Sequence, residues 1–319
     1  MQKAGTGGGV RYFDNSEVAE RLPFKQLVDA LEVGFRSGVT SPPRQVIETN
    51  PDAGSKLLLI KPSWNDRYTV VKLLTLTAGN RVVGLPYIQG VVALFDKGTG
   101  TPVAMMDANE LTCRRTAAAS ALAARFLARG DASKLAIVGT GALAPYMAEA
   151  HAAVRPISQV AVIGRSRQGA QAAVDRIRDA SPGLRSRVAE DGRAALAEAD
   201  VICTVTSSKT PVIDGNMVTK GSHVDLVGAF SPDARESDDA LIAKANIYVD
   251  CLTSALAEAG DLLIPIANGL ISREAILGDL SMLCHGRLSG RCDDAEITVF
   301  KSVGTALEDL IAAEIVATA

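Results

Sequence analysis

Three basic residues stand in otherwise apolar or small-residue surroundings, and together they have the chemistry to bind a carboxylate. Arg44 follows a proline turn in "SPPRQVIE", Lys72 lies inside the apolar run "TVVKLLTL", and Arg115 lies in "TCRRTAAASA". An isolated charge is costly to bury, so an inward-facing lysine in an apolar strand needs a partner or an anionic ligand. Each residue alone is compatible with a salt bridge or an outward-facing side chain. Together they predict a carboxylate clamp at a domain junction, with Lys72 as the candidate catalytic residue.

A glycine-rich turn predicts a dinucleotide site. "IVGTGALA" carries Gly139, Gly141 and Ala144 in a G-x-G-x-x-A pattern, with Ala142 and Leu143 between them. The first glycine permits a tight turn after a strand, and the second lets a pyrophosphate approach the backbone. The small third residue lets the helix pack closely on the strand, with its N-terminus facing the phosphates. The pattern alone is weak, but here a strand precedes it and a helix follows it.

The end of the next strand bears on the choice of nucleotide. Sites specific for NAD usually place Asp or Glu there to hold the ribose 2′-hydroxyl, whereas this chain has Gly164-Arg165-Ser166-Arg167. Two guanidiniums and a hydroxyl suit a 2′-phosphate, and no carboxylate is present to repel it. The alternative is a solvated basic turn. The position favours NADPH, with NADH accepted.

A third stretch, "GSHVDLVGAFSPDARESDD" (221–239), reads as a buried strand that runs out into a loop. In an α/β sheet, ligands bind at this carboxyl end of the strands. The residues at the exit are Val227 and Gly228, followed by Phe230. A phenyl ring can neither take nor give a proton, so Phe230 supplies no acid–base chemistry at this position.

Two different patterns of apolar residues, one before and one after about residue 107, predict the elements that carry these residues. Up to about residue 107, a helix at 23–38 precedes β-like runs at 56–64, 68–80 and 90–107, the last reversing at "DKGTGTP". After it come an alanine-rich helix at 110–130 and apolar strands that alternate with helices, which indicate a parallel sheet covered on both faces. A final helix is expected over 297–319. The fold class is therefore α/β, with a dinucleotide-binding domain and an α+β domain.

Composition excludes several classes of protein. The net charge of -3 gives no sign of a nucleic-acid partner, and no apolar run approaches the ~20 residues of a membrane span. The N-terminus has no apolar segment typical of a secretory signal. The five cysteines are scattered, which favours reduced thiols in a cytoplasmic protein. The three histidines show no ligand spacing, so no metal is assigned.

The chain resembles the ornithine cyclodeaminase/mu-crystallin family over nearly its whole length. The resemblance is carried by motifs that include "PPRQVIE", "VVKLLTL", "MMDANELTCRRTAAASALAARFLA", "IVGTGALA", "SPDARESDD", "VDCLTSALAEAGDL" and "EITVFKSVGTALEDL". It implies a homodimer with a Rossmann domain over 117–300. Residues 1–116 with 301–319 would form the domain that binds substrate and makes the dimer.

The resemblance also implies roles for particular residues. Arg44, Lys72 and Arg115 are expected to bind the substrate carboxylate. The resemblance places Thr116, the turn from Gly139 to Ala144, Val227, Gly228 and Ser302 near the cofactor. Together with Thr204 and the residues of the basic turn argued above, Arg165, Ser166 and Arg167, these are the expected cofactor neighbours.

The family's cyclodeaminases, like the related alanine dehydrogenases, carry Asp at this strand exit. This chain resembles them elsewhere but has Phe at position 230. Phe230 removes that base, as in the family's ketimine reductases. The resemblance therefore implies reduction of Δ1-pyrroline-2-carboxylate or Δ1-piperideine-2-carboxylate, small cyclic imino acids, to proline or pipecolate. The alternatives are an ornithine cyclodeaminase, an alanine or opine-type dehydrogenase, and a non-catalytic binding protein like mu-crystallin.

Overall fold

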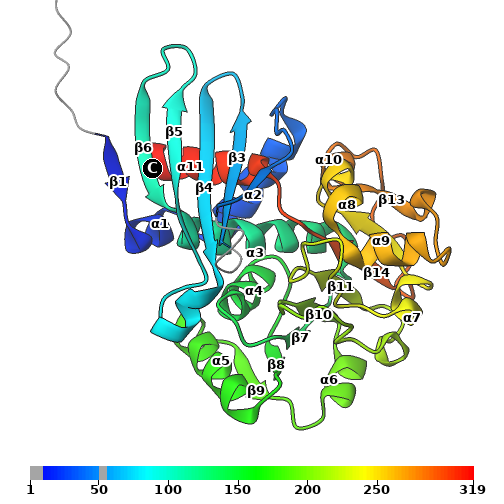
Figure 1. Ribbon diagram of the computed structural model, residues 1–319. Helices are drawn as coiled ribbons and strands as arrows, with labels where there is room; N and C mark the ends of the chain where they lie inside the picture. The colour runs from blue at the N-terminus through cyan, green and yellow to red at the C-terminus, as the bar shows by residue number, and fades with distance from the viewer. Residues whose placement is uncertain (1–9, 50–55) are drawn as a thin grey trace, which may run out of the picture. The chain divides into compact units, whose positions relative to one another are not determined.

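A computed structural model describes residues 10–49 and 56–319 of the chain (Figure 1). Most of the glycine-rich start, expected to lack a secretory signal, lies outside the described residues. The chain divides into two compact units. Unit 1 contains the residues up to 23, residues 38–112 and residues 306–319, and unit 2 contains residues 24–37 and 113–305.

Unit 1 is built on a mostly antiparallel sheet. Within the described residues its strands are β1 (Arg11–Phe13), β2 (Gln45–Glu48), β3 (Lys56–Trp64), β4 (Tyr68–Thr77), β5 (Ile88–Asp96) and β6 (Pro102–Asp107). Their order is β1-β6-β5-β4-β3-β2, and only β1 and β6 pair in parallel. The hairpin predicted at "DKGTGTP" is confirmed by the antiparallel pairing of β5 with β6, where Gly100 adopts a φ of 72°.

One face of this sheet packs on a helix. Unit 1 also holds α1 (Asn15–Arg21), the 3-10 helix η1 (Ala78–Val83) and α11 (Ala306–Thr318). Alternate residues of β4, Val70, Lys72, Leu74 and Leu76, are buried. They lie on the face that packs on α11, which follows from the two-residue period of a strand.

Unit 2 contains a parallel sheet. Its strands are β7 (Lys134–Val138), β8 (Gln159–Ile163), β9 (Arg185–Val188), β10 (Val201–Thr204), β11 (His223–Leu226), β12 (Asn246–Val249), β13 (Ile276–Asp279) and β14 (Thr298–Lys301). The order is β13-β12-β14-β11-β10-β7-β8-β9, and every pairing is parallel. Strands β7, β10 and β11 are almost wholly buried, as the continuous apolar runs predicted, and β14 is buried as well.

Unit 2 also contains the helices that connect or cover these strands. They are α2 (Phe24–Arg36), α3 (Ala108–Leu127, which begins in unit 1), α4 (Leu143–Ala152), α5 (Arg167–Ala180), α6 (Gly192–Glu198), α7 (Asp239–Ile242), α8 (Leu252–Glu258), α9 (Gly260–Ala267) and α10 (Leu280–Cys284), with 3-10 helices η2 (Gly215–Met217) and η3 (Arg273–Ala275). None of the helices in the described ranges is both long enough and apolar enough to cross a membrane.

The predicted boundaries 1–116, 117–300 and 301–319 differ from the observed units at α2. This helix falls in unit 2 because its apolar stripe packs on α10 and α4. The contact with α10 is fixed by two hydrogen bonds, from Arg36 Nε to the Cys284 carbonyl (2.6 Å) and from Ser281 Oγ to the Phe35 carbonyl (3.1 Å).

The prediction of one helix over 297–319 is wrong in its first part. Residues Thr298–Lys301 form β14, which lies between β11 and β12. All four residues are buried, and a strand covered on both faces shows no alternation that would distinguish it from a buried helix. Gly304, with a φ of 80°, separates this strand from α11.

Candidate active site

The carboxyl edge of the unit 2 sheet collects most of the predicted cofactor residues. Gly139 follows β7, Thr204 ends β10, Val227 follows β11 and Ser302 follows β14. Because all these strands are parallel, their carboxyl ends meet at one edge. From β7 the sheet continues to β8 and β9 on one side and to β10 and β11 on the other. This is the topological switch point at which α/β sheets bind ligands.

The glycine turn has the geometry that a pyrophosphate requires. Gly139 has a φ of 126°, and a Cβ there would lie 2.7 Å from the Val205 carbonyl oxygen. A Cβ on Gly141 would be 4.0 Å from its nearest neighbour, so the backbone there is open. Helix α4 begins at Leu143 with no side-chain hydrogen bond at its Ala142 cap, which leaves amide donors for an anion. These residues therefore fit a dinucleotide.

Two of the three polar residues in the basic turn after β8 already form hydrogen bonds or ion pairs within the protein. Ser166 caps α5, accepting a hydrogen bond from the Gly169 amide (3.1 Å), and its hydroxyl can still donate. Arg167 pairs with Glu190 at 2.8 Å, which raises the pKa of Arg167. Arg165 is exposed and forms no hydrogen bond or ion pair with any residue that the structure describes. The two arginines are therefore not equivalent as candidate phosphate ligands.

Arg115 and Thr116 lie on α3, in the part that belongs to unit 2. Arg115 is buried, whereas Thr116 is half-buried. The guanidinium of Arg115 packs on the backbone of Gly304, where a Cβ would lie 2.6 Å from Nη1. The buried Ser302 precedes this glycine by two residues, and its amide donates to the Leu226 carbonyl (3.2 Å).

Lys72 lies in unit 1 and faces a buried carboxylate. Its side chain is 0% exposed, and Nζ lies 2.6 Å from Asp309 Oδ1 and 3.3 Å from Thr112 Oγ1. Lys61, the register neighbour of Lys72 on β3, lies 3.8 Å from Asp309 Oδ2. The salt bridge considered as an alternative for Lys72 is therefore present. Arg44, half-buried, directly precedes β2.

Sequence reasoning missed Lys61 and Asp309. Lys61 interrupts the apolar run "KLLLIKPSW" as Lys72 interrupts its own strand, so the same signal marks it. Asp309 lies in an apolar helix and gives a comparable signal. Arg44 and Lys72 belong to unit 1 and Arg115 to unit 2, so the clamp of all three stays a prediction.

A buried glutamate, also missed, ties the exits of β10 and β11 together. Glu236 Oε2 accepts hydrogen bonds from Thr204 Oγ1 (2.8 Å) and from the amides of Gly228 (2.6 Å) and Ala229 (3.2 Å). Its Oε1 accepts from the amide and the hydroxyl of Thr206, each at 2.7 Å. The Thr204 hydroxyl, predicted to contact the cofactor, is thus used inside the protein.

The loop after β11 carries Phe230, which is 41% exposed. The acid nearest to it in the sequence is Asp233, which pairs with Lys209 at 2.6 Å and accepts from Ser231 Oγ at 2.7 Å. The Lys209 hydrogen bond, followed by the Ser231 one, lowers the pKa of Asp233 to about 2. Asp233 is therefore ionised near neutral pH and cannot donate a proton in place of an acid at position 230.

A buried cluster of His151, Cys203 and Asp225 lies in the core of unit 2. His151 Nε2 lies 3.1 Å from Cys203 Sγ and 3.3 Å from Asp225 Oδ2, and these atoms have the donor chemistry of a metal site. Sequence spacing missed it because α4, β10 and β11 each supply one residue. Burial, then the charge of Asp225, raises the pKa of Cys203 well above its ordinary value. The Cys203 thiol can then donate to Asp225 Oδ2, 3.6 Å from Sγ, and we interpret the cluster as hydrogen-bonded core.

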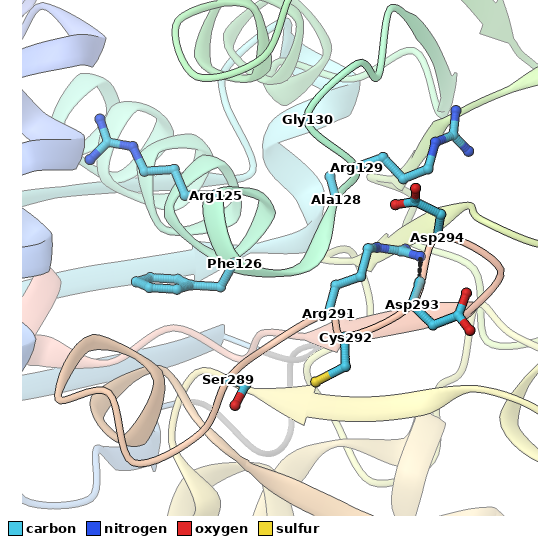
Figure 2. Close-up of a pocket in the computed structure, with 10 residues that line it drawn as sticks. All are labelled: Arg125, Phe126, Ala128, Arg129, Gly130, Ser289, Arg291, Cys292, Asp293 and Asp294. Atoms are coloured by element: carbon cyan, nitrogen blue, oxygen red, sulfur yellow. Dashed lines mark hydrogen bonds between the residues drawn. The ribbon is translucent and has the colours of Figure 1, made fainter.

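A cavity of about 380 Å³ in unit 2 is lined by residues that end or follow α3, by Ser289 and by residues 291–294 (Figure 2). Its arginines are already engaged. Arg125 pairs with Glu32 (3.2 Å), Arg129 pairs with Asp200 (2.5 Å), and Arg291 donates to the carbonyls of Leu127 (2.7 Å) and Glu296 (2.6 Å). We therefore interpret these arginines as supports for the end of α3 and not as substrate ligands.

The parallel sheet, with a glycine turn and an uncapped helix at its switch point, defines unit 2 as a dinucleotide-binding domain of the Rossmann class. Residues 12–318 match the model of the ornithine cyclodeaminase/mu-crystallin family, and the chain belongs to that family. The resemblance inferred from the motifs is thereby confirmed.

Three similar proteins are informative. The Delta(1)-pyrroline-2-carboxylate reductase of Colwellia psychrerythraea is 38% identical over 300 residues, which cover 93% of this chain and 95% of the relative. The structure of the Thermococcus litoralis Delta(1)-pyrroline-2-carboxylate reductase in complex with NADH and L-proline matches with a TM-score of 0.92 and 30% identity, over 97% of this chain and 96% of the other. An archaeal alanine dehydrogenase dimer with bound NAD matches with a TM-score of 0.89 and 29% identity, over 97% and 95%.

Proposed function

We propose that this protein reduces a cyclic imino acid, Δ1-pyrroline-2-carboxylate or Δ1-piperideine-2-carboxylate, to L-proline or L-pipecolate with a nicotinamide cofactor. Phe230 is the observation that carries the proposal. A side chain that cannot exchange protons lies at the strand exit, and the neighbouring acids are engaged, Glu236 by hydrogen-bond donors and Asp233 by Lys209. Expulsion of ammonia from an acyclic diamine needs a base, and this site has none at position 230. Reduction of a preformed C=N bond needs no such base.

The substrate's carboxylate would be bound by Arg44, Lys72 and Arg115. When bound, the cofactor supplies the hydride that reduces the imine carbon. Asp309 holds Lys72 Nζ at 2.6 Å and so fixes the position from which this cation acts. Orientation of the imine carbon by its anchored carboxylate would supply much of the rate. Lys72 or water would provide the proton if the imine binds unprotonated.

Oxidation of NADPH in the presence of pyrroline-2-carboxylate tests this function. We expect turnover with the cyclic imino acid that exceeds turnover with pyruvate plus ammonia. Turnover only with pyruvate and ammonia would indicate an alanine dehydrogenase, an activity that a structural neighbour favours. Conversion of ornithine to proline with release of ammonia would show that position 230 does not decide the chemistry. A Lys72→Ala variant with full turnover would contradict the clamp.

For the cofactor we propose NADPH, with NADH accepted. Arg165 is the exposed cation available for a 2′-phosphate, whereas Arg167 already pairs with Glu190. An Arg165→Ala variant should weaken binding of NADPH more than of NADH, and Arg167→Ala should have the smaller effect on that preference. Equal loss for both nucleotides in the Arg165 variant would mean that this arginine is a surface residue only.

We propose a homodimer that forms through the open face of the unit 1 sheet. One row of register partners on that face runs across five strands and consists of Pro62, Val71, Ala93, Met105 and Tyr12. These side chains are half-buried or exposed, and Tyr12 is 50% exposed. A contiguous apolar row of this kind marks an interaction surface. A Val71→Asp variant should be monomeric by sedimentation analysis, and a dimer in that variant would place the interface elsewhere.

A further inference from the structure

The buried carboxylate of Glu236 has a role that its surroundings specify. Glu236 is 0% exposed, and its two oxygens accept hydrogen bonds from Thr204, Thr206, Gly228 and Ala229. Three of these donors are backbone amides, which cannot accept a proton. Among the residues that the structure describes, no cation forms an ion pair with Glu236. Its two oxygens are therefore held by hydrogen-bond donors and not by a direct ion pair.

This charge lies where two neighbouring strands leave the sheet. Thr204 ends β10, and Gly228 follows β11 by two residues. A Cβ on Gly228 would lie 2.1 Å from the Thr206 carbonyl oxygen, so the two exit loops are in direct backbone contact. Glu236 bonds to both loops and fixes their relative position.

The glutamate is itself held by a second buried acid. Asp261 Oδ1 accepts from the amides of Glu236 (2.8 Å) and Ser237 (2.9 Å), and Asp261 Oδ2 lies 3.2 Å from Lys301 Nζ. Asp261 and Lys301 are both 0% exposed. Glu236 is thus a rigid group, and with both oxygens engaged it cannot serve as a proton donor.

We infer that Glu236 is a positioning residue that biases the site toward the oxidised, positively charged form of the nicotinamide. This inference rests on the proposed function, because it takes the nicotinamide to lie at the exits of β10 and β11. A fixed negative charge favours the pyridinium over the neutral dihydropyridine. It therefore favours the positive charge that develops as the hydride leaves.

Asp250 provides a matched control. It is also buried, and it accepts hydrogen bonds from the amides of Cys251 (2.8 Å) and Val303 (2.8 Å) at the exits of β12 and β14. Strands β14 and β11 separate β12 from β10, and Asp250 accepts no hydrogen bond from the exit loops of β10 and β11 within the described residues. A purely structural effect of losing a buried carboxylate should appear in Asp250→Asn as well.

The experiment measures the dissociation constants of NADPH and NADP⁺, by nucleotide fluorescence and its displacement, for wild type, Glu236→Gln and Asp250→Asn. The same measurement is made with NADH and NAD⁺. We expect Glu236→Gln to weaken binding of the oxidised form relative to the reduced form by on the order of tenfold. This is the size of effect expected when one nearby charge is removed. Asp250→Asn should lower the melting temperature and leave the ratio unchanged. Glu236→Asp, which keeps the charge, should restore part of the ratio.

Thr206→Val provides a second route that does not depend on the folding of Glu236→Gln. It removes one hydroxyl donor, leaves the charge less offset, and should shift the ratio toward the oxidised nucleotide. Unchanged ratios in Thr206→Val and in any folded Glu236→Gln would overturn the inference. The titrations need no imino acid, so absence of turnover with a shifted ratio would contradict the proposed function alone. Wild-type protein that binds neither nucleotide would contradict both.

Discussion

Replacement of Asp309 by Asn should destabilise the protein severely. The change removes the carboxylate that lies 2.6 Å from Lys72, which is 0% exposed, and 3.8 Å from the buried Lys61. Breaking a buried ion pair by removing one partner costs about 3–5 kcal/mol. That loss is a large part of the roughly 5–15 kcal/mol by which domains are stable. Urea denaturation at fixed protein concentration, followed by circular dichroism, measures it.

The same helix supplies the control for this variant. Glu314 pairs with Arg67, and the two side chains are 21% and 67% exposed, so Glu314→Gln should cost at most about 1 kcal/mol. Loss of the Asp309 carboxylate disfavours the charged form of the buried Lys72, so the difference in stability between wild type and Asp309→Asn should grow as pH falls below about 10. If Asp309→Asn is no less stable than Glu314→Gln, the ion pair is not the support that we describe.

Three further experiments test other features. Burial lowers the pKa of His223 to about 3, so the native state binds fewer protons than the unfolded state. Stability should fall by about 1.4 kcal/mol per pH unit as pH drops below about 6.5, and His223→Gln should flatten this slope in acid denaturation. Cys292, which is exposed, should react with a thiol reagent in the native protein, whereas Cys203 should react only after unfolding; rapid reaction of both would contradict the buried cluster. Gly139→Ala should lose stability and nucleotide binding together, because its Cβ meets the Val205 carbonyl. Gly141→Ala should fold normally and weaken only nucleotide binding. Equal melting temperatures in the two variants would contradict the expectation that only Gly139→Ala loses stability.

The sequence predicted features that depend on local pattern. The glycine turn, the strands around it and the hairpin at "DKGTGTP" each follow from residues within a few positions of one another. One charge in an apolar strand likewise raised an inward-facing Lys72 as one of two alternatives, and the structure has this side chain buried. The partner of Lys72 could not be inferred, because Asp309 lies 237 residues away and only the fold brings the two residues together.

Other features could not be obtained from pattern alone. Glu236 stands in a polar stretch, "SPDARESDD", in which burial has no signature. Strand β14 was taken as the start of a helix because a wholly buried strand carries no period. Helix α2 was placed with the sheet that follows it in the chain, although its apolar stripe packs on α10 and α4.

The distance in sequence between Lys72 and Asp309 also constrains biosynthesis. The two residues are separated by 237 positions, which translation at about 5–20 residues per second covers in roughly 10–50 s. During that interval the nascent chain holds Lys61 and Lys72 on the inner face of its first sheet without the Asp309 carboxylate and without the helix α11 that packs on that face. The amino-terminal sheet therefore cannot reach its final state on the ribosome before α11 is made.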